Sequence, residues 1–228
     1  MPTSSRRLAI VGLRNSKWSN FSLKTLGVVD YGVGNLRSVA NALDYIGTQW
    51  GIVSSPDQVS EFDRLLLPGV GAFGSAMDRL EKTGLKESLL QAYRRGQPLL
   101  GICLGMQLLT EGSEESPSVD GLGIIPGMTT KLPGGGIETN TGFRTVTAVD
   151  GDRSLVWDKP ERDYYFNHGF RVEPTAAVSV GTTTWGGLSI CAAVEFENAS
   201  GVQFHPEKSQ GQGLALLKNF ATSGSLRL

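Results

Sequence analysis

One cysteine lies at the junction between an apolar strand and a helix, where a nucleophile is expected. Cys103 ends the run Leu99–Ile102, and Gly101 and Gly105 stand two residues away on either side. This spacing is typical of a nucleophile elbow, a tight strand-to-helix turn that exposes the side chain at its apex. A helix predicted over Leu104–Glu111 would direct its positive N-terminal end at the sulfur and favour the thiolate. Covalent catalysis at Cys103 is one interpretation, and a buried structural cysteine is the other.

Two polar residues follow Cys103 at helical spacing. Gln107 and Glu111 stand four and eight residues after it, so a continuous helix would place both on the face of the sulfur. An amide and a carboxylate in these positions could hold the ends of a ligand that the sulfur attacks. We therefore predict that Gln107 and Glu111 bind substrate.

A cysteine nucleophile needs a base, and the chain has two histidines. His205 ends an apolar strand, Pro206 keeps the backbone extended, and Glu207 follows two residues after the histidine. Glu207 could hold one ring nitrogen while the other serves Cys103. The alternative is a surface histidine at the end of a strand. His168 follows aromatic residues on another predicted strand, where a core or surface histidine without catalytic work is the simpler interpretation.

A glycine-rich turn, Pro68–Gly74, lies between a predicted strand and a predicted helix. It matches the G-x-G-x-x-G pattern of dinucleotide sites, but Arg94 and Arg95 stand where that site needs an acidic residue. We favour a loop whose backbone N–H groups approach an oxyanion together with the N–H of Leu104. A plain glycine-rich turn remains the alternative. The run Pro133–Gly136 lacks the Lys and Ser/Thr of a phosphate loop.

The composition favours a small-molecule enzyme of the cytoplasm. The chain has 228 residues, 39% of them hydrophobic, and a net charge of -1 without a block of like charges. We expect one domain and neither a nucleic-acid nor a membrane partner. Cys103 and Cys191 form no disulfide framework, which fits a reducing compartment. Two histidines and two dispersed cysteines show no metal-ligand spacing, so no metal is predicted. Cys191 is interpreted as core.

Residues 1–24 differ in composition from the rest of the chain. They carry five basic residues and no acidic one among many serines. We predict a disordered N-terminal extension ahead of one catalytic domain at residues 25–228. A transit peptide and a start codon assigned too early are the alternatives.

Strands and helices alternate in the first half of the chain. Because strand–helix–strand units form parallel sheets with right-handed crossovers, we predict an α/β fold with an open, mostly parallel central sheet and flanking helices. Ligands gather at the carboxyl ends of such strands, where the turn Tyr31–Asn35, the turn Pro68–Gly74 and Cys103 would converge. The predicted strands are Leu26–Asp30, Thr48–Ser54, Arg64–Leu67 and Leu99–Ile102, and the predicted helices are Leu36–Ile46, Ser75–Gly96 and Leu104–Glu111.

The chain after Pro126 is predicted to be rich in short strands. Alternating and β-branched residues favour strands, and a turn at Glu197–Gly201 joins the last two as a hairpin. A final helix is predicted at Gly213–Ala221. The strands are Phe143–Val149, Asp163–Phe170, Ala177–Gly181, Leu188–Phe196 and Gly201–Pro206.

Three motifs together resemble the class I glutamine amidotransferases: GICLGMQ, PGVG and FHPEKS. DYGVGNL, PGVGAFG and GLALLKNF after HPEKS are most similar to the glutaminase subunit of imidazole glycerol phosphate synthases, over about residues 26–221. The resemblance implies Cys103 as nucleophile, His205 as base and then acid, and Glu207 as orienting carboxylate. It further implies an oxyanion hole and a glutamine site. These comprise Val70, Gly71 and Leu104 for the oxyanion, and Gln107, Glu111, His168, Gly169 and Phe170 for glutamine.

The resemblance also implies a reaction and a partner. Attack on the glutamine amide gives a glutamyl thioester and ammonia, without a cofactor. A (β/α)8-barrel cyclase subunit, bound as a heterodimer, receives the ammonia to make imidazole glycerol phosphate and an aminoimidazole carboxamide ribotide in histidine biosynthesis. Partner and acceptor binding would complete the oxyanion hole, which couples the two activities.

Two segments depart from the family pattern. Thr139–Arg144 reads TNTGFR where the family usually has PHxGWN, and Asn167–Phe170 reads NHGF where it has VHSY. The family places both segments near the partner or the glutamine. A divergent paralogue that supplies ammonia to another synthase, for instance in sugar amidination, is therefore an alternative. A stand-alone γ-glutamyl hydrolase and a catalytically silent interaction subunit are two more.

Overall fold

The structure is a computed structural model that describes residues 26–133, 139–149 and 161–226. The predicted extension at residues 1–24 and residues 134–136 of the second glycine run lie outside the described residues. No helix within the described ranges is long and apolar enough to cross a membrane.

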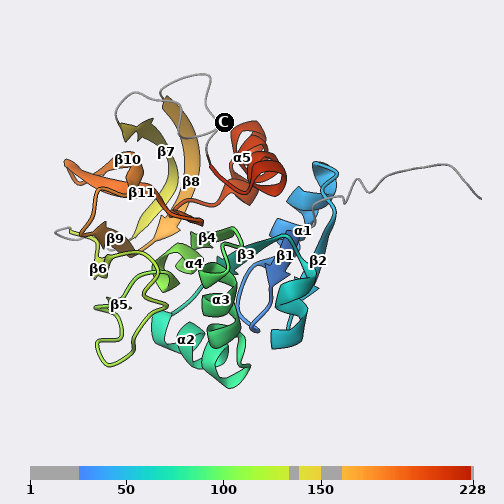
Figure 1. Cartoon of the computed structure of the whole chain (residues 1–228). Helices are drawn as coiled ribbons and strands as arrows, with labels where there is room; N and C mark the ends of the chain where they lie inside the picture. The colour runs from blue at the N-terminus through green and yellow to red at the C-terminus, as the bar shows by residue number, and fades with distance from the viewer. Residues whose placement is uncertain (1–25, 134–138, 150–160, 227–228) are drawn as a thin grey trace, which may run out of the picture.

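The fold is organised around one large mixed sheet (Figure 1). Its strand order is β2-β1-β3-β4-β12-β11-β10-β7-β8. The first five strands in this order run parallel, and the other four join by antiparallel pairing. The parallel strands are β1 (Leu26–Val29), β2 (Trp50–Val53), β3 (Arg64–Gly69), β4 (Leu99–Cys103) and β12 (Ala199–Val202). The predicted α/β class, with a mostly parallel centre and a strand-rich second half, is confirmed.

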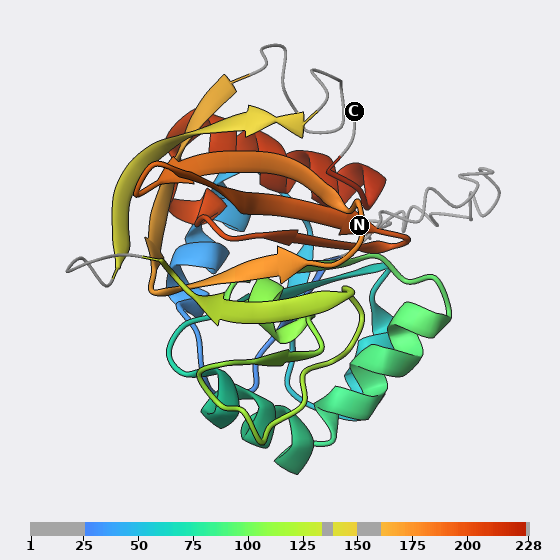
Figure 2. The same cartoon turned by 90° about the vertical axis from the view of Figure 1, so that its left-hand side faces the viewer.

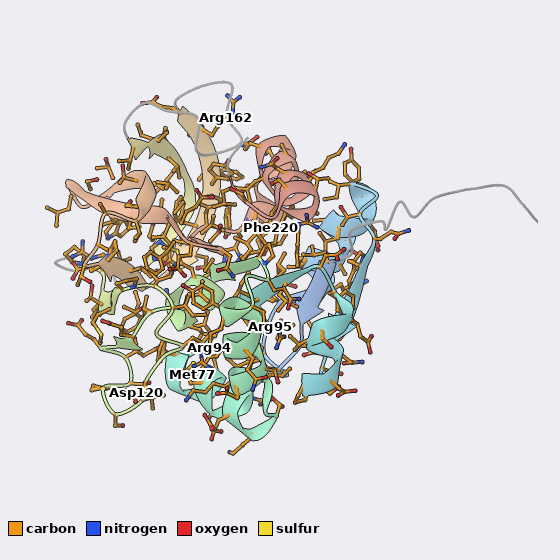
Figure 3. All side chains as sticks on the ribbon, in the orientation of Figure 1. Met77, Arg94, Arg95, Asp120, Arg162 and Phe220 are labelled. Carbon is orange, nitrogen blue, oxygen red and sulfur yellow. The ribbon has the colours of Figure 1, made fainter. Side chains whose placement is uncertain are left out.

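Helices cover both faces of the parallel part. In β3, Leu65 and Leu67 point into one buried cluster and Leu66 into the other, as the alternation of a strand requires. Met77 of α2 belongs to the first cluster and Phe220 of α5 to the second, and both are labelled in Figure 3. The helices are α1 (Leu36–Tyr45), α2 (Phe73–Lys82), α3 (Leu85–Arg94), α4 (Leu104–Leu108) and α5 (Gln210–Ser223).

The single helix predicted over Ser75–Gly96 is wrong. Two helices, α2 and α3, stand there, separated at Thr83 and Gly84. Gly84 has a φ of 73°, and a left-handed residue cannot continue a right-handed helix. Arg94 and Arg95, labelled in Figure 3, end α3 on the surface.

Strand β7, in yellow in Figure 2, curves strongly along its length. Although β8 is last in the strand order, the backbone N–H of His205, just after β12, donates to Tyr165 O of β8 at 2.8 Å. A second sheet, β5-β6-β9, lies beside the first. The remaining strands are β5 (Gly112–Ser113), β6 (Gly127–Lys131), β7 (Asn140–Ala148), β8 (Glu161–His168), β9 (Phe170–Pro174), β10 (Ser179–Trp185) and β11 (Leu188–Phe196).

Close packing between β3 and α4 depends on a glycine. A Cβ added at Gly105 would lie 1.8 Å from Leu67 O, a backbone atom that cannot move alone. We expect Gly105→Ala to lower the free energy of unfolding by about 3 kcal/mol or more, because the strand and helix must separate. Gly211→Ala is the matched control, since its new methyl group meets open space on α5. Urea unfolding should show little change in the free energy of unfolding for Gly211→Ala. Equal decreases in the two variants would contradict the explanation.

Candidate active site

Cys103 occupies a strained turn between β4 and α4. Its φ of 55° and ψ of −109° make it one of three described non-glycine residues with positive φ. Such a conformation costs of order 1–3 kcal/mol and tends to be retained at functional sites. The flanking glycines allow the turn, since a Cβ on Gly101 would lie 2.6 Å from the backbone of Gly105. The predicted elbow geometry is therefore present, with the sulfur at the carboxyl end of the central strand.

Parallel pairing brings Cys103 and His205 together across a long stretch of sequence. Strand β12 pairs with β4 so that Val202 lies opposite Ile102. The cysteine follows Ile102 directly, and the histidine follows Val202 by three residues, so both emerge at the same sheet edge. Both side chains line one cavity of about 340 Å³.

His205 is held by a buried carboxylate. Its Nδ1 lies 2.8 Å from Oε1 of Glu207, and both side chains are at most 3% exposed. Burial alone would lower the pKa of His205, but hydrogen bonds to Cys103 and Glu207, together with their negative charges, raise it to about 9. Because Nδ1 is engaged by Glu207, the imidazole presents Nε2 to the sulfur. This arrangement can hold a thiolate–imidazolium pair and move a proton at Nε2.

The glycine-rich loop after β3 forms one wall of the cavity. Val70 and Gly71 line it together with Leu104. The hydroxyl of Tyr31, from the turn after β1, donates to Pro68 O at 3.0 Å and fixes the start of the loop. The three sheet-edge turns predicted to converge therefore do so, and the Val70–Gly71 backbone lines the same cavity as Cys103. Their role as an oxyanion hole remains a prediction.

The second half of the chain supplies the opposite wall. His168, Gly169 and Phe170, at the junction of β8 and β9, line the cavity. Gln107 lines it from α4, and its Nε2 donates to Phe170 O at 3.1 Å. Four of the five residues predicted to bind glutamine thus surround Cys103.

Glu111 is the exception, and its predicted placement is wrong. Helix α4 ends at Leu108, because the carbonyls of Leu108 and Leu109 accept hydrogen bonds from the N–H groups of Leu122 and Ile124, both at 2.9 Å, and the chain turns towards β5. A residue beyond the helix no longer shares the face of Cys103. Glu111 is exposed, does not line the cavity, and accepts a hydrogen bond from the N–H of Gly127 at 3.3 Å.

A different carboxylate, missed from the sequence, lines the cavity. Glu115 follows Cys103 by twelve residues and sits on the loop after β5. Its Oε2 accepts from the N–H of Phe73 at 2.7 Å, which holds the side chain at the start of α2. Helical periodicity could not identify Glu115, because the intervening chain is not helical. Three more lining residues were also missed as site residues: Thr139, Asn167 and Lys208.

His168 is a neutral structural element of the wall. Its Nδ1 lies 2.7 Å from Phe170 O, which can only accept, so Nδ1 carries the proton. Its Nε2 then accepts from Nδ2 of Asn140, 3.1 Å away. Burial and the charge of His205 together lower its pKa to about 4, against the hydrogen bond to Phe170 O, which raises it. At neutral pH His168 therefore holds the Phe170 carbonyl rather than moving protons.

This buried neutral histidine predicts a loss of stability in acid. The folded-state pKa of about 4 lies below the ordinary 6.5, so folding is favoured above pH 6.5 and loses this contribution as pH falls towards 4. Between pH 6.5 and 4.5 the loss amounts to roughly 2 to 3 kcal/mol. Urea unfolding of the wild type and of His168→Gln at both pH values checks this. A drop of the same size in the variant would assign the effect to other groups.

Among the described residues, no three His, Cys, Asp or Glu side chains gather as a metal site. The cavity instead combines a thiol, an imidazole–carboxylate pair, the Val70–Gly71 backbone, an amide and a second carboxylate. Lys208 adds an ammonium group to the lining. This set can perform nucleophilic acyl transfer on a small polar ligand.

Comparison with known proteins identifies the class. The family model described as "Glutamine amidotransferase class-I" matches residues 27–223, and the chain belongs to this family. Two solved structures share the fold. One is titled a glutamine amidotransferase, with a TM-score of 0.68, 16% identity and coverage of 86% of this chain and 96% of the other. The other is PurLQS from Thermotoga maritima, with a TM-score of 0.67, 20% identity and coverage of 86% and 99%.

Relatives with higher identity point to a particular member of the class. The chain is 44% identical over 195 residues to imidazole glycerol phosphate synthase subunit HisH of Methanothermobacter thermautotrophicus, covering 86% of this chain and 96% of the relative. It is 40% identical over 203 residues to the HisH subunit of Chlorobaculum tepidum, covering 85% and 98%. It is also 38% identical over 210 residues to the chloroplastic hisHF protein of Arabidopsis thaliana, covering 89% of this chain and 35% of that longer chain.

Proposed function

We propose that this chain is the glutaminase subunit of an imidazole glycerol phosphate synthase and acts in histidine biosynthesis. Membership of the glutamine amidotransferase class and the identities to HisH subunits support this function. The observation that carries the chemistry is one cavity lined by Cys103 and His205, with Glu207 bonded to the imidazole. The substrate is glutamine, and the products are glutamate and ammonia.

The cavity suits glutamine at both ends. The carboxylate of Glu115 is half-buried at the cavity wall and can pair with the α-ammonium group of the substrate. Gln107 and the Gly169–Phe170 backbone contribute polar groups beside the rest of the ligand. The side-chain amide then reaches Cys103 at the elbow.

The reaction follows from the placement of the groups. The thiolate of Cys103 attacks the amide carbon, and the negative charge on its oxygen meets N–H groups of Leu104 and the Val70–Gly71 loop. The imidazolium gives its Nε2 proton to the leaving nitrogen, the C–N bond breaks, and ammonia departs from the thioester. His205 next takes a proton from water, whose oxygen attacks the thioester, and the C–S bond breaks to release glutamate. Glu207 stabilises the imidazolium throughout.

The partner is a cyclase subunit that binds over the cavity mouth. Val70 is 36% exposed although it lines the cavity, and Phe143 of the TNTGFR segment is 44% exposed with its ring against Tyr165. Exposed apolar side chains near a reactive centre favour a protein surface that covers them. The match to one part of the longer hisHF chain supports joint action with a second unit. Closure by this partner would keep ammonia from water.

The proposal is tested by measuring glutamate release from glutamine. The chain is assayed alone, with a cyclase subunit, and with the cyclase subunit and its ribonucleotide substrate. We expect glutamate release to be at least tenfold faster in the complete mixture than in the other two, or to occur there alone. Imidazole glycerol phosphate should form at the same rate as glutamate. Equal rates in all three mixtures would favour a stand-alone γ-glutamyl hydrolase. Glutamate release without cyclase product would favour a paralogue that serves another synthase.

The two carboxylates Glu115 and Glu111 make separate predictions. Glu115→Gln keeps an oxygen acceptor for the Phe73 N–H but loses the charge, so KM for glutamine should rise roughly 10- to 100-fold. Glu111→Gln is the matched control, because Glu111 lies outside the cavity. Its KM should stay within about twofold. Steady-state kinetics of the complex decide between the two carboxylates. A larger rise in KM for Glu111→Gln than for Glu115→Gln would mean that Glu111 binds glutamine.

A further inference from the structure

A buried amide beside the nucleophile has no role in the mechanism above. Gln203 follows β12 directly and is 0% exposed. Its Nε2 lies 3.8 Å from Sγ of Cys103, within hydrogen-bond range for sulfur. Gln203 does not line the cavity, so it reaches the sulfur from within the protein.

Neighbouring groups fix which end of this amide faces the sulfur. Phe170 O can only accept, so the group of Gln107 at 3.1 Å from it is the NH₂ end. The same NH₂ lies 3.2 Å from Gln203, which must present its oxygen there. The NH₂ group of Gln203 is therefore turned towards Cys103.

The orientation is anchored further along the same network. His168 donates from Nδ1 to Phe170 O, and Asn140 donates to Nε2 of His168. Each step pairs one donor with one acceptor, and the members Asn140, His168, Gln107 and Gln203 are all buried. Such a network resists rearrangement because a flipped amide would leave two buried groups unpaired.

We propose that Gln203 is a further catalytic residue, which donates a hydrogen bond from Nε2 to the thiolate of Cys103. This inference rests on the proposed glutaminase function. Sγ also lies 4.0 Å from Asn167 O, which can serve only the protonated thiol. Once the proton moves to His205, that carbonyl offers the sulfur nothing, whereas the N–H of Gln203 stabilises its negative charge. Gln203 thereby favours the ionised nucleophile and holds it at the elbow.

Alkylation of Cys103 by iodoacetamide tests the proposal without glutamine. Cys191→Ala is used as background, so that Cys103 is the sole thiol. We expect Gln203→Met to slow alkylation of Cys103 at pH 7 roughly tenfold relative to the Cys191→Ala protein. At high pH the two rates should become similar, because loss of the donor no longer limits ionisation of the thiol. Gln97→Met is the matched control. It also loses a side-chain amide, which donates to Val59 O and Phe62 O away from the cavity, and its rate should not change.

Kinetics of the complex give a second readout. Gln203→Met should lower kcat about tenfold while KM for glutamine stays within about threefold. If Gln203→Met is alkylated at pH 7 as fast as the protein with Gln203 intact, while the wild-type complex releases glutamate, the role of Gln203 is overturned and the glutaminase function is left intact. No glutamate from the wild-type complex would instead remove the proposed function.

The wild-type chain provides a test that does not require Gln203→Met to fold. The side-chain amide resonance of Gln203 in a ¹⁵N spectrum should shift over the pH range in which alkylation of Cys103 accelerates. This shift should be lost in Cys103→Ala. A Gln203 amide chemical shift that does not change with pH in the wild type would overturn the proposal.

Discussion

Replacing Cys103 by alanine is expected to lower glutamine hydrolysis by the complete complex roughly 10⁴-fold or more, because no thioester can form. Cys103 is 6% exposed, and alanine can keep the same backbone turn, so the fold should survive. Glutamate release is the measurement, with circular dichroism to confirm folding.

The second cysteine provides the control for this prediction. Cys191 lies in the core of β11, where burial raises the pKa of its thiol to about 11, against hydrogen bonds to Ser179 and Ala193 O. A neutral buried thiol is a poor nucleophile. Cys191→Ala should therefore cost some stability and leave kcat within about twofold. Activity in Cys103→Ala above about a hundredth of wild type would contradict covalent catalysis at this residue.

The sequence predicted the elements near Cys103 well because local rules govern them. The apolar run before Cys103 and the glycines around it define the strand and the turn, and the structure has both. The hairpin of β11 and β12 is confirmed for the same reason, since a short polar turn joins two strand-forming segments, but β12 occupies Ala199–Val202 and not the predicted Gly201–Pro206. Pairing His205 with Glu207 needed only their separation of two residues at the end of a strand.

Features set by tertiary structure were not predictable in this way. Periodicity says nothing of the insertion of β12 beside β4, which unites Cys103 with His205, so that meeting was inferred from chemistry and resemblance. The return of β8 to the cavity depends on the curvature of the whole sheet. The prediction that α4 extends to Glu111 was wrong because tertiary contacts end the helix. Glu115 was not predicted because it lies on a loop, where helical spacing does not apply.

The network behind the sulfur also lies beyond sequence reasoning. Gln203 stands in an apolar strand end and resembles an ordinary buried polar residue. Only the distances to Cys103 and Gln107 distinguish it. Buried amides beside a nucleophile gain significance when their hydrogen bonds fix which end faces the reactive atom.

Replacing Glu207 by glutamine is the second large change that we expect, with a fall in kcat of roughly 10² to 10⁴-fold. The amide can still contact Nδ1 of His205, but it carries no charge to stabilise the imidazolium and can hold the wrong tautomer. The distance of 2.8 Å and the burial of both side chains make this contact strong in the wild type. Glu87→Gln, at an exposed site on α3, is the control and should retain full activity.

The pH profile distinguishes this electrostatic role from a loss of folding. In the wild type, hydrogen bonds to Cys103 and Glu207 raise the pKa of His205 to about 9 against the effect of burial. The imidazolium of His205 therefore persists until pH rises through that value. Removing the carboxylate lowers the pKa of His205, so the alkaline limb of kcat/KM should move to lower pH in Glu207→Gln. An unmoved alkaline limb with reduced kcat would mean that Glu207 only supports the fold.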